Sequence, residues 1–284
     1  MAAGSGTLRK MSNQMSNAST TERASGRILV ERDGALAKIT FNKPERMNAM
    51  SLDMWQSLHE ALDDLACDEA VRVVILTGAG DKAFVSGADI SEFETQRSSE
   101  DSVRAYNAVS EAADAALYHF PKPTIAQIQG YCIGGGMGLA VGCDFRICSD
   151  DSRLGITAAR LGLGYNQEGV RKLVELAGPS VAARILYSAE LFPAEQARSM
   201  GLVTDVVRRD QLPSAVQSLA ERIARNAPLT IKAAKAAIRA IGGAEGAPNS
   251  EKVARQVEAC FSSEDYVEGR RAFAEKRKPN FTGL

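Results

Sequence analysis

The sequence predicts an α/β protein made of repeated turns of strand and helix, followed by a helical C-terminal subdomain. Short apolar strands alternate with helical segments between residues 27 and 150, and the chain after Tyr165 is almost wholly helical. Its 284 residues, 45% of them hydrophobic, suffice to bury a full core. Continuously apolar strands between helices are typical of a parallel sheet covered by helices. Such turns can wind as a Rossmann sheet or stack as a coil, and their pattern is compatible with both.

The alternating elements occupy the first half of the chain. We expect strands in ILVERD and LAKITFN, a helix over 51–66, a strand in VRVVILTG, a helix over 102–118, a strand over 124–128, a helix from Gly135 and a strand in DFRICS. Ser51 is placed to cap the first of these helices, whose apolar residues recur at the spacing of one helix face.

The two ends of the chain differ in composition from this alternating core. Residues 1–25 are rich in Ser, Thr, Asn, Ala and Gly, which predicts a disordered tail before a core over 26–205. The segment 206–284 is predicted to be a helical C-terminal subdomain. The expected C-terminal elements are a strand over 202–207 and helices over 167–176, 180–187, 194–200, 211–225, 230–241, 250–261 and 264–277.

Composition excludes several classes of function. The 34 basic and 35 acidic residues give a net charge of −1, so we expect neither nucleic acid nor an anionic membrane as a partner. No apolar run approaches the roughly 20 residues of a membrane span, and no secretory signal opens the sequence, which favours a cytoplasmic location over an organelle matrix. The five cysteines show no C-x-x-C spacing and are expected to be buried thiols. Because only two histidines are present and the cysteines do not cluster, we predict no metal site.

The stretch GYCIGGGMGLA, residues 130–140, is the clearest candidate site. Its glycines follow an apolar strand and open a helix, whose N-terminus carries about half a positive charge and offers unpaired N–H groups. Such a site suits a carbonyl oxygen that becomes negative. A second turn, FVSGADI, offers the amide of Ala88, and the Ala88 and Gly135 amides can converge on one oxygen if both strands lie in one sheet. Either turn alone is also explained as an ordinary tight turn.

Five segments together resemble the enoyl-CoA hydratase/isomerase, or crotonase, superfamily. They are FNKPERMNAMS, KAFVSGADISEF, KPTIAQIQGYCIGGGMGLAVGCDFRI, AEQARSMGLVTDVV and AFAEKRKPNF. The resemblance implies a crotonase-like spiral of strand–strand–helix turns, and a homotrimer or homohexamer built through the C-terminal helices. It also implies an acyl-CoA substrate, with coenzyme A present as part of the thioester and no tightly bound cofactor. A Rossmann site is not expected, because GGGMG lacks the G-x-G-x-x-G register.

The same resemblance implies roles for individual residues. Ala88 and Gly135 resemble the two oxyanion-hole donors of the family. The residues that correspond to a pocket for the acyl-CoA are Arg46, Met47, Ser86, Ala88, Asp89, Ile90 and Gly134. Phe273 and Lys276 resemble contacts to the nucleotide end of CoA, from the same subunit or a neighbour, although an amphipathic helix also explains them. Asp89 is expected to brace its turn rather than react.

Two positions depart from the hydratase pattern of this superfamily. Its hydratases use two glutamates to hold and deprotonate water, and here those positions are Gly138 and Ala158. Residues 135 and 138 share a helix face, so a carboxylate at 138 would point to the same site as the Gly135 amide. Loss of one positioned acid or base costs roughly a hundred- to ten-thousand-fold in rate. We therefore do not expect two-glutamate hydration.

The loop LGLGYNQEG supplies a different candidate, Tyr165, a poor base but a competent proton donor. It resembles the corresponding loop of methylmalonyl-CoA decarboxylase, a member of this superfamily, although that enzyme has a histidine where this chain has Ala88. A loop aromatic that merely packs explains Tyr165 equally. Bases for a double-bond shift could come from Glu92, Glu94 or Glu111. Isomerisation, decarboxylation and weak hydration stay open, as does an acyl-CoA-binding protein without catalysis.

Overall fold

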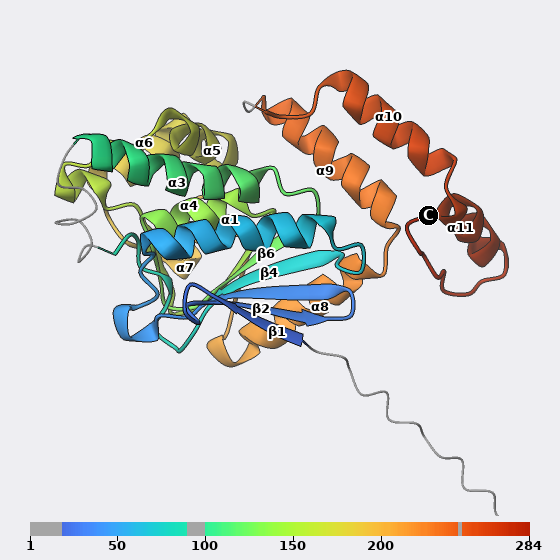
Figure 1. The fold of residues 1–284 in the computed structure, drawn as a ribbon, viewed down its shortest axis with the longest axis horizontal. Coiled ribbons are helices and arrows are strands. Elements are labelled where there is room, and N and C mark those ends of the chain that lie inside the picture. Colours follow the sequence, from blue (N-terminus) through green and yellow to red (C-terminus); the bar gives the residue numbers. More distant parts are fainter. Residues whose placement is uncertain (1–18, 90–99, 244–245) are drawn as a thin grey trace, which may run out of the picture.

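The computed structural model describes residues 19–89, 100–243 and 246–284 (Figure 1). The strands are β1 (Ser19–Arg23), β2 (Ile28–Asp33), β3 (Leu36–Phe41), β4 (Val73–Gly78), β5 (Ala83–Val85), β6 (Thr124–Ile128), β7 (Tyr131–Ile133), β8 (Phe145–Ser149), β9 (Arg153–Gly155), β10 (Phe192–Pro193) and β11 (Asp205–Val207). The α-helices are α1 (Leu52–Cys67), α3 (Glu100–Tyr118), α4 (Gly135–Gly142), α5 (Gln167–Ala177), α6 (Pro179–Ser188), α7 (Ala194–Ser199), α8 (Leu212–Ala224), α9 (Pro228–Gly242), α10 (Ser250–Phe261) and α11 (Glu264–Ala274). Short 3₁₀ turns lie at Pro44–Arg46, Ala158–Leu161 and Arg209–Gln211.

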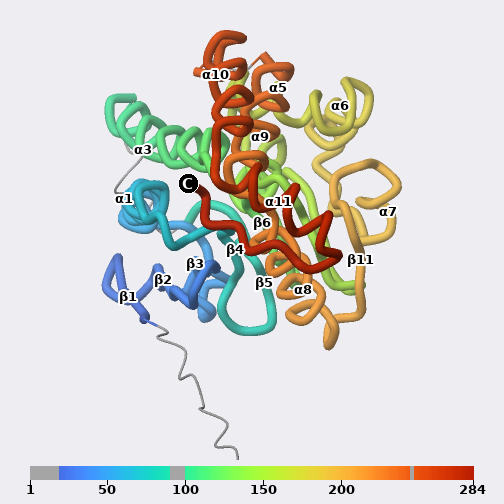
Figure 2. Tube along the Cα trace, turned by 90° about the vertical axis from the view of Figure 1, so that its right-hand side faces the viewer, coloured from blue at the N-terminus to red at the C-terminus, as the bar shows by residue number. Residues whose placement is uncertain are grey.

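The strands form two sheets, and each turn of the chain contributes one strand to each sheet. The larger has the order β1-β2-β3-β4-β6-β8-β11, which runs across Figure 2, and the smaller has the order β10-β9-β7-β5. The pairs β4–β5, β6–β7 and β8–β9 each place their first strand in the larger sheet and their second in the smaller one. The first strands of successive pairs run parallel to one another in the larger sheet, and the second strands run parallel in the smaller sheet. The chain is therefore a stacked spiral and not a Rossmann sheet, in agreement with the superfamily resemblance.

Helices cover both faces of the larger sheet (Figure 1). On one face, α1 buries Met54, Leu58, Leu62 and Leu65 in the main core, and α3 lies beside it. On the other face, α8 packs Leu212, Val216 and Ala220 against the apolar strands β4, β6 and β8 in a second cluster. Each helix thus presents the apolar stripe that its sequence spacing predicts.

The N-cap of α1 differs from the expectation. Ser51 occupies the N-cap position, but its hydroxyl hydrogen-bonds the carboxylate of Asp53 instead of a backbone amide. The Asp53 carboxylate in turn accepts from the Met54 amide at 2.9 Å. The acid within the first turn therefore takes part of the capping role, in line with the preference for negative charge at a helix N-terminus.

The core extends beyond the predicted residues 26–205 at both ends. Residues 19–23, placed by composition in the disordered tail, form β1 and pair antiparallel with β2. The pairing corrects the expectation, because backbone hydrogen bonds along an edge strand do not require large apolar side chains. At the other end, β11 pairs with β8 and α8 belongs to the second core cluster, so the core continues beyond residue 205 through Ala224.

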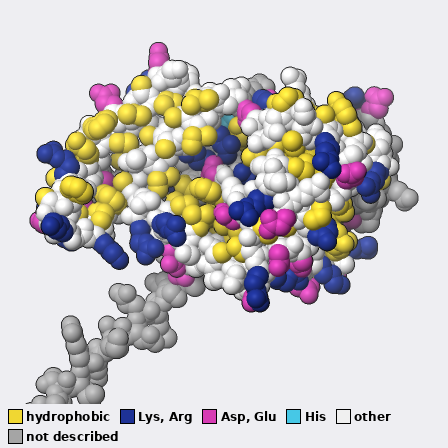
Figure 3. All heavy atoms as spheres, turned by 180° about the vertical axis from the view of Figure 1, so that it is seen from behind, with side chains coloured by type: hydrophobic (Ala, Val, Ile, Leu, Met, Phe, Trp, Pro, Cys, Tyr) yellow, Lys and Arg dark blue, Asp and Glu magenta, His cyan; other side chains and the backbone are white. Residues whose placement is uncertain are grey.

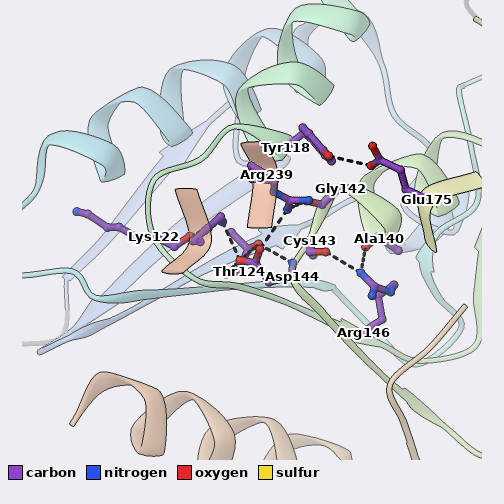
Figure 4. Close-up of polar contacts among 11 residues, drawn as sticks. Tyr118, Lys122, Thr124, Ala140, Gly142, Cys143, Asp144, Arg146, Glu175 and Arg239 are labelled. Atoms are coloured by element: carbon purple, nitrogen blue, oxygen red, sulfur yellow. Dashed lines mark hydrogen bonds and ion pairs between the residues drawn. The ribbon is translucent and has the colours of Figure 1, made fainter. Parts of the chain in front are cut away.

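The C-terminal helices attach to the core through a buried ionic cluster. Asp144 accepts from Lys235 of α9 at 2.7 Å and from Arg239 of α9 at 3.1 Å, and it also accepts from the Thr124 amide (Figure 4). Arg239 donates to the Gly142 carbonyl, and Arg146 donates to the Cys143 carbonyl. Both arginines interact favourably with the negative C-terminal end of α4, and Arg239 ties this end to the C-terminal helices.

The cysteines are all free thiols, but not all are buried. Cys132, Cys143 and Cys148 are buried as expected, whereas Cys67 at the end of α1 is exposed and Cys260 is half-buried. Within the described ranges, no helix has the length and apolarity required to cross a membrane. No group of metal-binding side chains is found among these residues either.

Candidate active site

One cavity of about 440 Å³ lies between the two glycine turns, α3, α4 and the loop before α5. Both predicted oxyanion donors line it. Residues of the smaller sheet carry the two turns, because β5 leads into residues 86–88 and β7 leads into Gly134 and α4. Since β5 and β7 are parallel neighbours, their carboxyl ends meet at the same edge of the sheet. The two turns therefore follow strands of one sheet, as convergence of the two amides requires.

The turn at Ala88 directs one amide into the cavity. Met50 donates to the Gly87 carbonyl at 2.8 Å and accepts from the Asp89 amide at 2.9 Å, as in a parallel bridge to Ala88. In such a bridge the N–H of Ala88 itself points away from Met50, and Ala88 lines the cavity. No described residue accepts a hydrogen bond from this amide.

The turn at Gly135 begins α4 and lies directly against the first turn. Gly134 has φ +55°, a conformation that favours glycine, and its amide donates to the Gly155 carbonyl at 2.9 Å. A Cβ atom on Gly134 would lie 3.8 Å from the Cα of Gly87. A Cβ on Gly136 would lie 2.2 Å from the Val85 carbonyl oxygen, so glycine is needed there for α4 to approach β5. The Gly135 amide, at the first position of α4, has no acceptor within the described part of the chain.

Comparisons with known proteins agree with this arrangement. A family model described as enoyl-CoA hydratase/isomerase matches residues 31–284. The chain belongs to the enoyl-CoA hydratase/isomerase family. The crotonyl-CoA hydratase of Syntrophomonas wolfei is 35% identical over 259 residues, which cover 89% of this chain and 97% of that protein. The methylmalonyl-CoA decarboxylase of Escherichia coli is 31% identical over 250 residues, which cover 87% of this chain and 95% of that protein.

Solved structures give the same result. The structure of an enoyl-CoA hydratase/carnithine racemase from Magnetospirillum magneticum matches with a TM-score of 0.87 at 37% identity, covering 92% of this chain and 97% of that one. The protein is thus an enzyme of the enoyl-CoA hydratase/isomerase superfamily that acts on acyl-CoA, with the crotonase fold.

The Tyr165 hydroxyl lies beside Gly138, the position predicted to match the first hydratase glutamate. A Cβ on Gly138 would meet only the Tyr165 hydroxyl, at 3.5 Å, which is ordinary van der Waals contact. Packing therefore does not require glycine at 138, in contrast to 136. Ala158, predicted to match the second hydratase glutamate, begins a 3₁₀ turn and also lines the cavity. The structure brings Gly138, Ala158 and Tyr165 to one cavity wall with no carboxylate at either family position.

Tyr165 has the surroundings of a proton donor. Burial raises the pKa of Tyr165 well above its usual range, and the negative charge of Asp114 raises it further. The phenol is therefore protonated at neutral pH. Its hydroxyl lines the cavity and makes no hydrogen bond to any residue that the structure describes. Asn166 next to it caps α5 by accepting from the Gly169 amide at 2.7 Å, which fixes the loop.

Asp89 braces the first turn, as the sequence predicts. Its carboxylate accepts from Lys43 Nζ at 2.5 Å, and both side chains are buried. The neighbouring Asn48 holds the same region by donating to the carbonyls of Ala79 and Ala83 at 2.9 and 2.8 Å. The turn at Ala88 is thus supported by polar contacts among residues that do not line the cavity.

Two polar residues of the cavity escaped the sequence analysis. Asp114 on α3 and Lys172 on α5 both line it and form an ion pair of 2.5 Å. Glu111, a predicted candidate base, lies at the cavity wall and accepts from Asn166 at 2.9 Å. Asn107, Glu111 and Asp114 are spaced to share one face of a helix. This spacing indicates a polar cavity wall only once α3 is known to cover the site.

The residues predicted to contact CoA fall into separate groups. Ser86 lines the cavity, and its amide and hydroxyl donate to the carbonyls of Met47 and Arg46, which places both residues beside the oxyanion turn. Phe273 lines a second, apolar groove between α9, α10 and α11, and Lys276 follows α11. Neither belongs to the lining of the first cavity. Ile90, Glu92 and Glu94 lie outside the described residues.

Proposed function

We propose that the cavity binds an acyl-CoA thioester with its carbonyl oxygen between the amides of Ala88 and Gly135, and that the enzyme works through the resulting enolate. Two adjacent amides without protein acceptors, one of them at a helix N-terminus, support this proposal. Removal of one such donor in other enzymes costs about a hundred- to a thousand-fold in rate. Backbone donors at this edge can therefore supply much of the catalysis without an acid or base.

We further propose that the proton step does not use two glutamates and that Tyr165 donates the proton. The observation that carries this is the Tyr165 hydroxyl, 3.5 Å from where a Cβ on Gly138 would lie. Since its phenol stays protonated, Tyr165 suits protonation of an enolate and not removal of a proton from carbon. An enolate that forms without a base is best supplied by decarboxylation of a 2-carboxyacyl-CoA, and the methylmalonyl-CoA decarboxylase relative supports this choice.

The proposed reaction is a decarboxylation followed by protonation of the enolate. The bond between the α-carbon and the carboxylate breaks, its electron pair passes into the thioester enolate, and carbon dioxide leaves. The two backbone amides hold the negative oxygen. The phenol proton of Tyr165 then moves to the α-carbon, and the phenolate recovers a proton from solvent.

A substrate panel tests the reaction class. Purified protein is assayed with crotonyl-CoA, a 3-enoyl-CoA and methylmalonyl-CoA, with product analysis by mass spectrometry. The expected result is carbon dioxide release from methylmalonyl-CoA that exceeds crotonyl-CoA hydration. If isomerisation of the 3-enoyl-CoA were the dominant activity, the proposed decarboxylation would be wrong, but the proposed enolate intermediate would stand. Turnover of none of the three, with acyl-CoA still bound, would favour the non-catalytic binding protein.

We also propose that copies of the chain associate through α9–α11 into a trimer or a hexamer. Exposed apolar side chains gather on these helices, on the lobe at the left of Figure 3. They are Ile238, Ile241, Val257, Phe261, Tyr266, Val267 and Phe273. In such an assembly Phe273 and Lys276 can reach the nucleotide end of CoA in a neighbouring subunit. Light scattering at micromolar concentration gives the mass, and a monomer would contradict the proposal.

A further inference from the structure

One wall of the cavity carries a buried ion pair for which enolate chemistry has no use. Lys172 Nζ donates to Asp114 Oδ2 at 2.5 Å, with side chains 5% and 25% exposed. Lys172 also lies 4.8 Å above the ring of Tyr118. Both ions line the same cavity as Ala88 and Gly135. Because the desolvation of a buried pair can exceed its Coulombic gain, the pair is weak evidence for a purely stabilising role.

The glycines of α4 show where this pair lies relative to the thioester. Gly135, Gly138 and Gly142 share one face of α4, since they are three and four residues apart. Cβ atoms on these glycines would face, in order, Trp55, the Tyr165 hydroxyl, and Leu117 with Asp114 Oδ1 at 3.9 Å. The axial separation of Gly135 and Gly142 is about 10 Å. An acyl chain whose carbonyl lies at Gly135 and which follows α4 therefore passes Tyr165 before it reaches Asp114.

The pair leaves one carboxylate oxygen of a cavity-lining residue without a partner among the described residues. Lys172 occupies Asp114 Oδ2, whereas Asp114 Oδ1 accepts from no residue in the described ranges. Among the described residues, the charged side chains that line the cavity are those of Glu111, Asp114 and Lys172, so the lining is net acidic. Glu111 and Glu168 both act on Asp114, while Lys172 is the one cation that lines this cavity among the described residues. A free acceptor in an acidic field binds an uncharged hydrogen-bond donor and disfavours a carboxylate.

We propose that Asp114 and Lys172 form a polar subsite for the distal part of the acyl chain, which recognises a hydroxyl group. The preferred substrates are then hydroxyacyl-CoA thioesters rather than plain alkyl or ω-carboxyl ones. The proposal rests on the proposed function, because it assumes that the thioester lies at Ala88 and Gly135. A hydroxyl donates to Asp114 Oδ1, whereas an alkyl chain end would cover the two ions and return no hydrogen bond.

Binding of unreactive saturated thioesters tests the subsite. Isothermal titration compares hexanoyl-CoA, 6-hydroxyhexanoyl-CoA and adipyl-CoA, together with the corresponding eight-carbon set. In the wild-type protein the hydroxyacyl thioester of at least one length should bind about tenfold more tightly than its alkyl counterpart, as expected for a hydrogen bond to a charged group. The ω-carboxyl thioester should bind most weakly. Equal affinities for hydroxyl and alkyl chains at both lengths would overturn the proposal without any variant.

A matched pair of double variants separates recognition from packing. Asp114→Asn with Lys172→Met removes both charges of the subsite. Asp101→Asn with Arg104→Met likewise removes both charges of an exposed ion pair on α3. The first variant should lose the hydroxyl preference to within about twofold and bind the alkyl thioester more tightly, and the second should keep the wild-type order. An undiminished preference in the first variant would refute the subsite. Failure of every acyl-CoA to bind the wild type would refute the proposed function as well.

Discussion

The two halves of the cavity are built from different parts of the polypeptide. The proposed oxyanion half, at Ala88 and Gly135, consists of backbone amides held by a parallel bridge, a helix start and close glycine packing. The opposite half consists of side chains, and it includes Gly138 and Ala158, the positions predicted to match the hydratase glutamates. A site made of backbone persists when side chains change, whereas one point substitution alters an acid or base. Membership of the family therefore predicts the first half far better than the second.

Loss of the Tyr165 hydroxyl should have the largest effect on the side-chain half. Tyr165→Phe keeps the ring and removes the donor, so kcat on the best substrate should fall about a hundredfold or more. Tyr131→Phe is the matched control, because Tyr131 is exposed on β7 and does not line the cavity. Steady-state rates of the two variants give the comparison. An unchanged kcat in Tyr165→Phe would assign the proton step to another group.

The support behind the backbone half should be the next most sensitive feature. Lys43→Met removes the buried partner of Asp89 and should lower the free energy of unfolding by about 3 kcal/mol. Lys38→Met breaks an exposed pair with Glu31 and should cost less than about 0.5 kcal/mol. Urea unfolding measures both. Similar losses in the two variants would show that the oxyanion turn does not depend on this brace.

Two glycines on α4 should respond oppositely to the same change. Gly136→Ala brings a Cβ against the Val85 carbonyl and should cost about 1–3 kcal/mol of stability. Gly138→Ala meets only the Tyr165 hydroxyl at 3.5 Å and should be neutral or slightly stabilising, because alanine is the better helix former. Thermal unfolding distinguishes them. A large loss of stability in Gly138→Ala would mean that glycine is retained there for packing.

The burial of Asp114 should make the free energy of unfolding depend on pH, and this effect should be the smallest of the four. Burial raises the pKa of Asp114 above 3.8, with Lys172 opposing the shift. Between 3.8 and this raised pKa the folded protein binds more protons than the unfolded one, so this group's contribution to stability falls as pH rises through that window. The difference in unfolding free energy between wild type and Asp114→Asn should follow this slope. A difference that grows in favour of wild type with rising pH would show that the ion pair with Lys172 dominates instead.

Sequence patterns predicted local features well and long-range ones less well. The two glycine turns, the apolar face of α1 and the helices after Tyr165 follow from spacing within a short segment. The choice between a spiral and a Rossmann sheet required the resemblance, because it depends on which sheet receives β5, β7 and β9. Asp114 and Lys172 are 58 positions apart and meet only when α3 packs beside α5, so no local pattern linked them. β1 was missed because an edge strand is held by backbone hydrogen bonds.

The infrared spectrum of crotonyl-CoA bound to the wild-type protein tests both halves in one sample. The thioester carbonyl reports on the amides of Ala88 and Gly135, and the carbon–carbon double bond reports on hydration. The account predicts a carbonyl band shifted to lower frequency by the two hydrogen bonds, with a double bond that persists over the time of the measurement. An unshifted carbonyl band would contradict the oxyanion half. Rapid loss of the double bond to water would contradict the claim that the hydratase acid and base are missing.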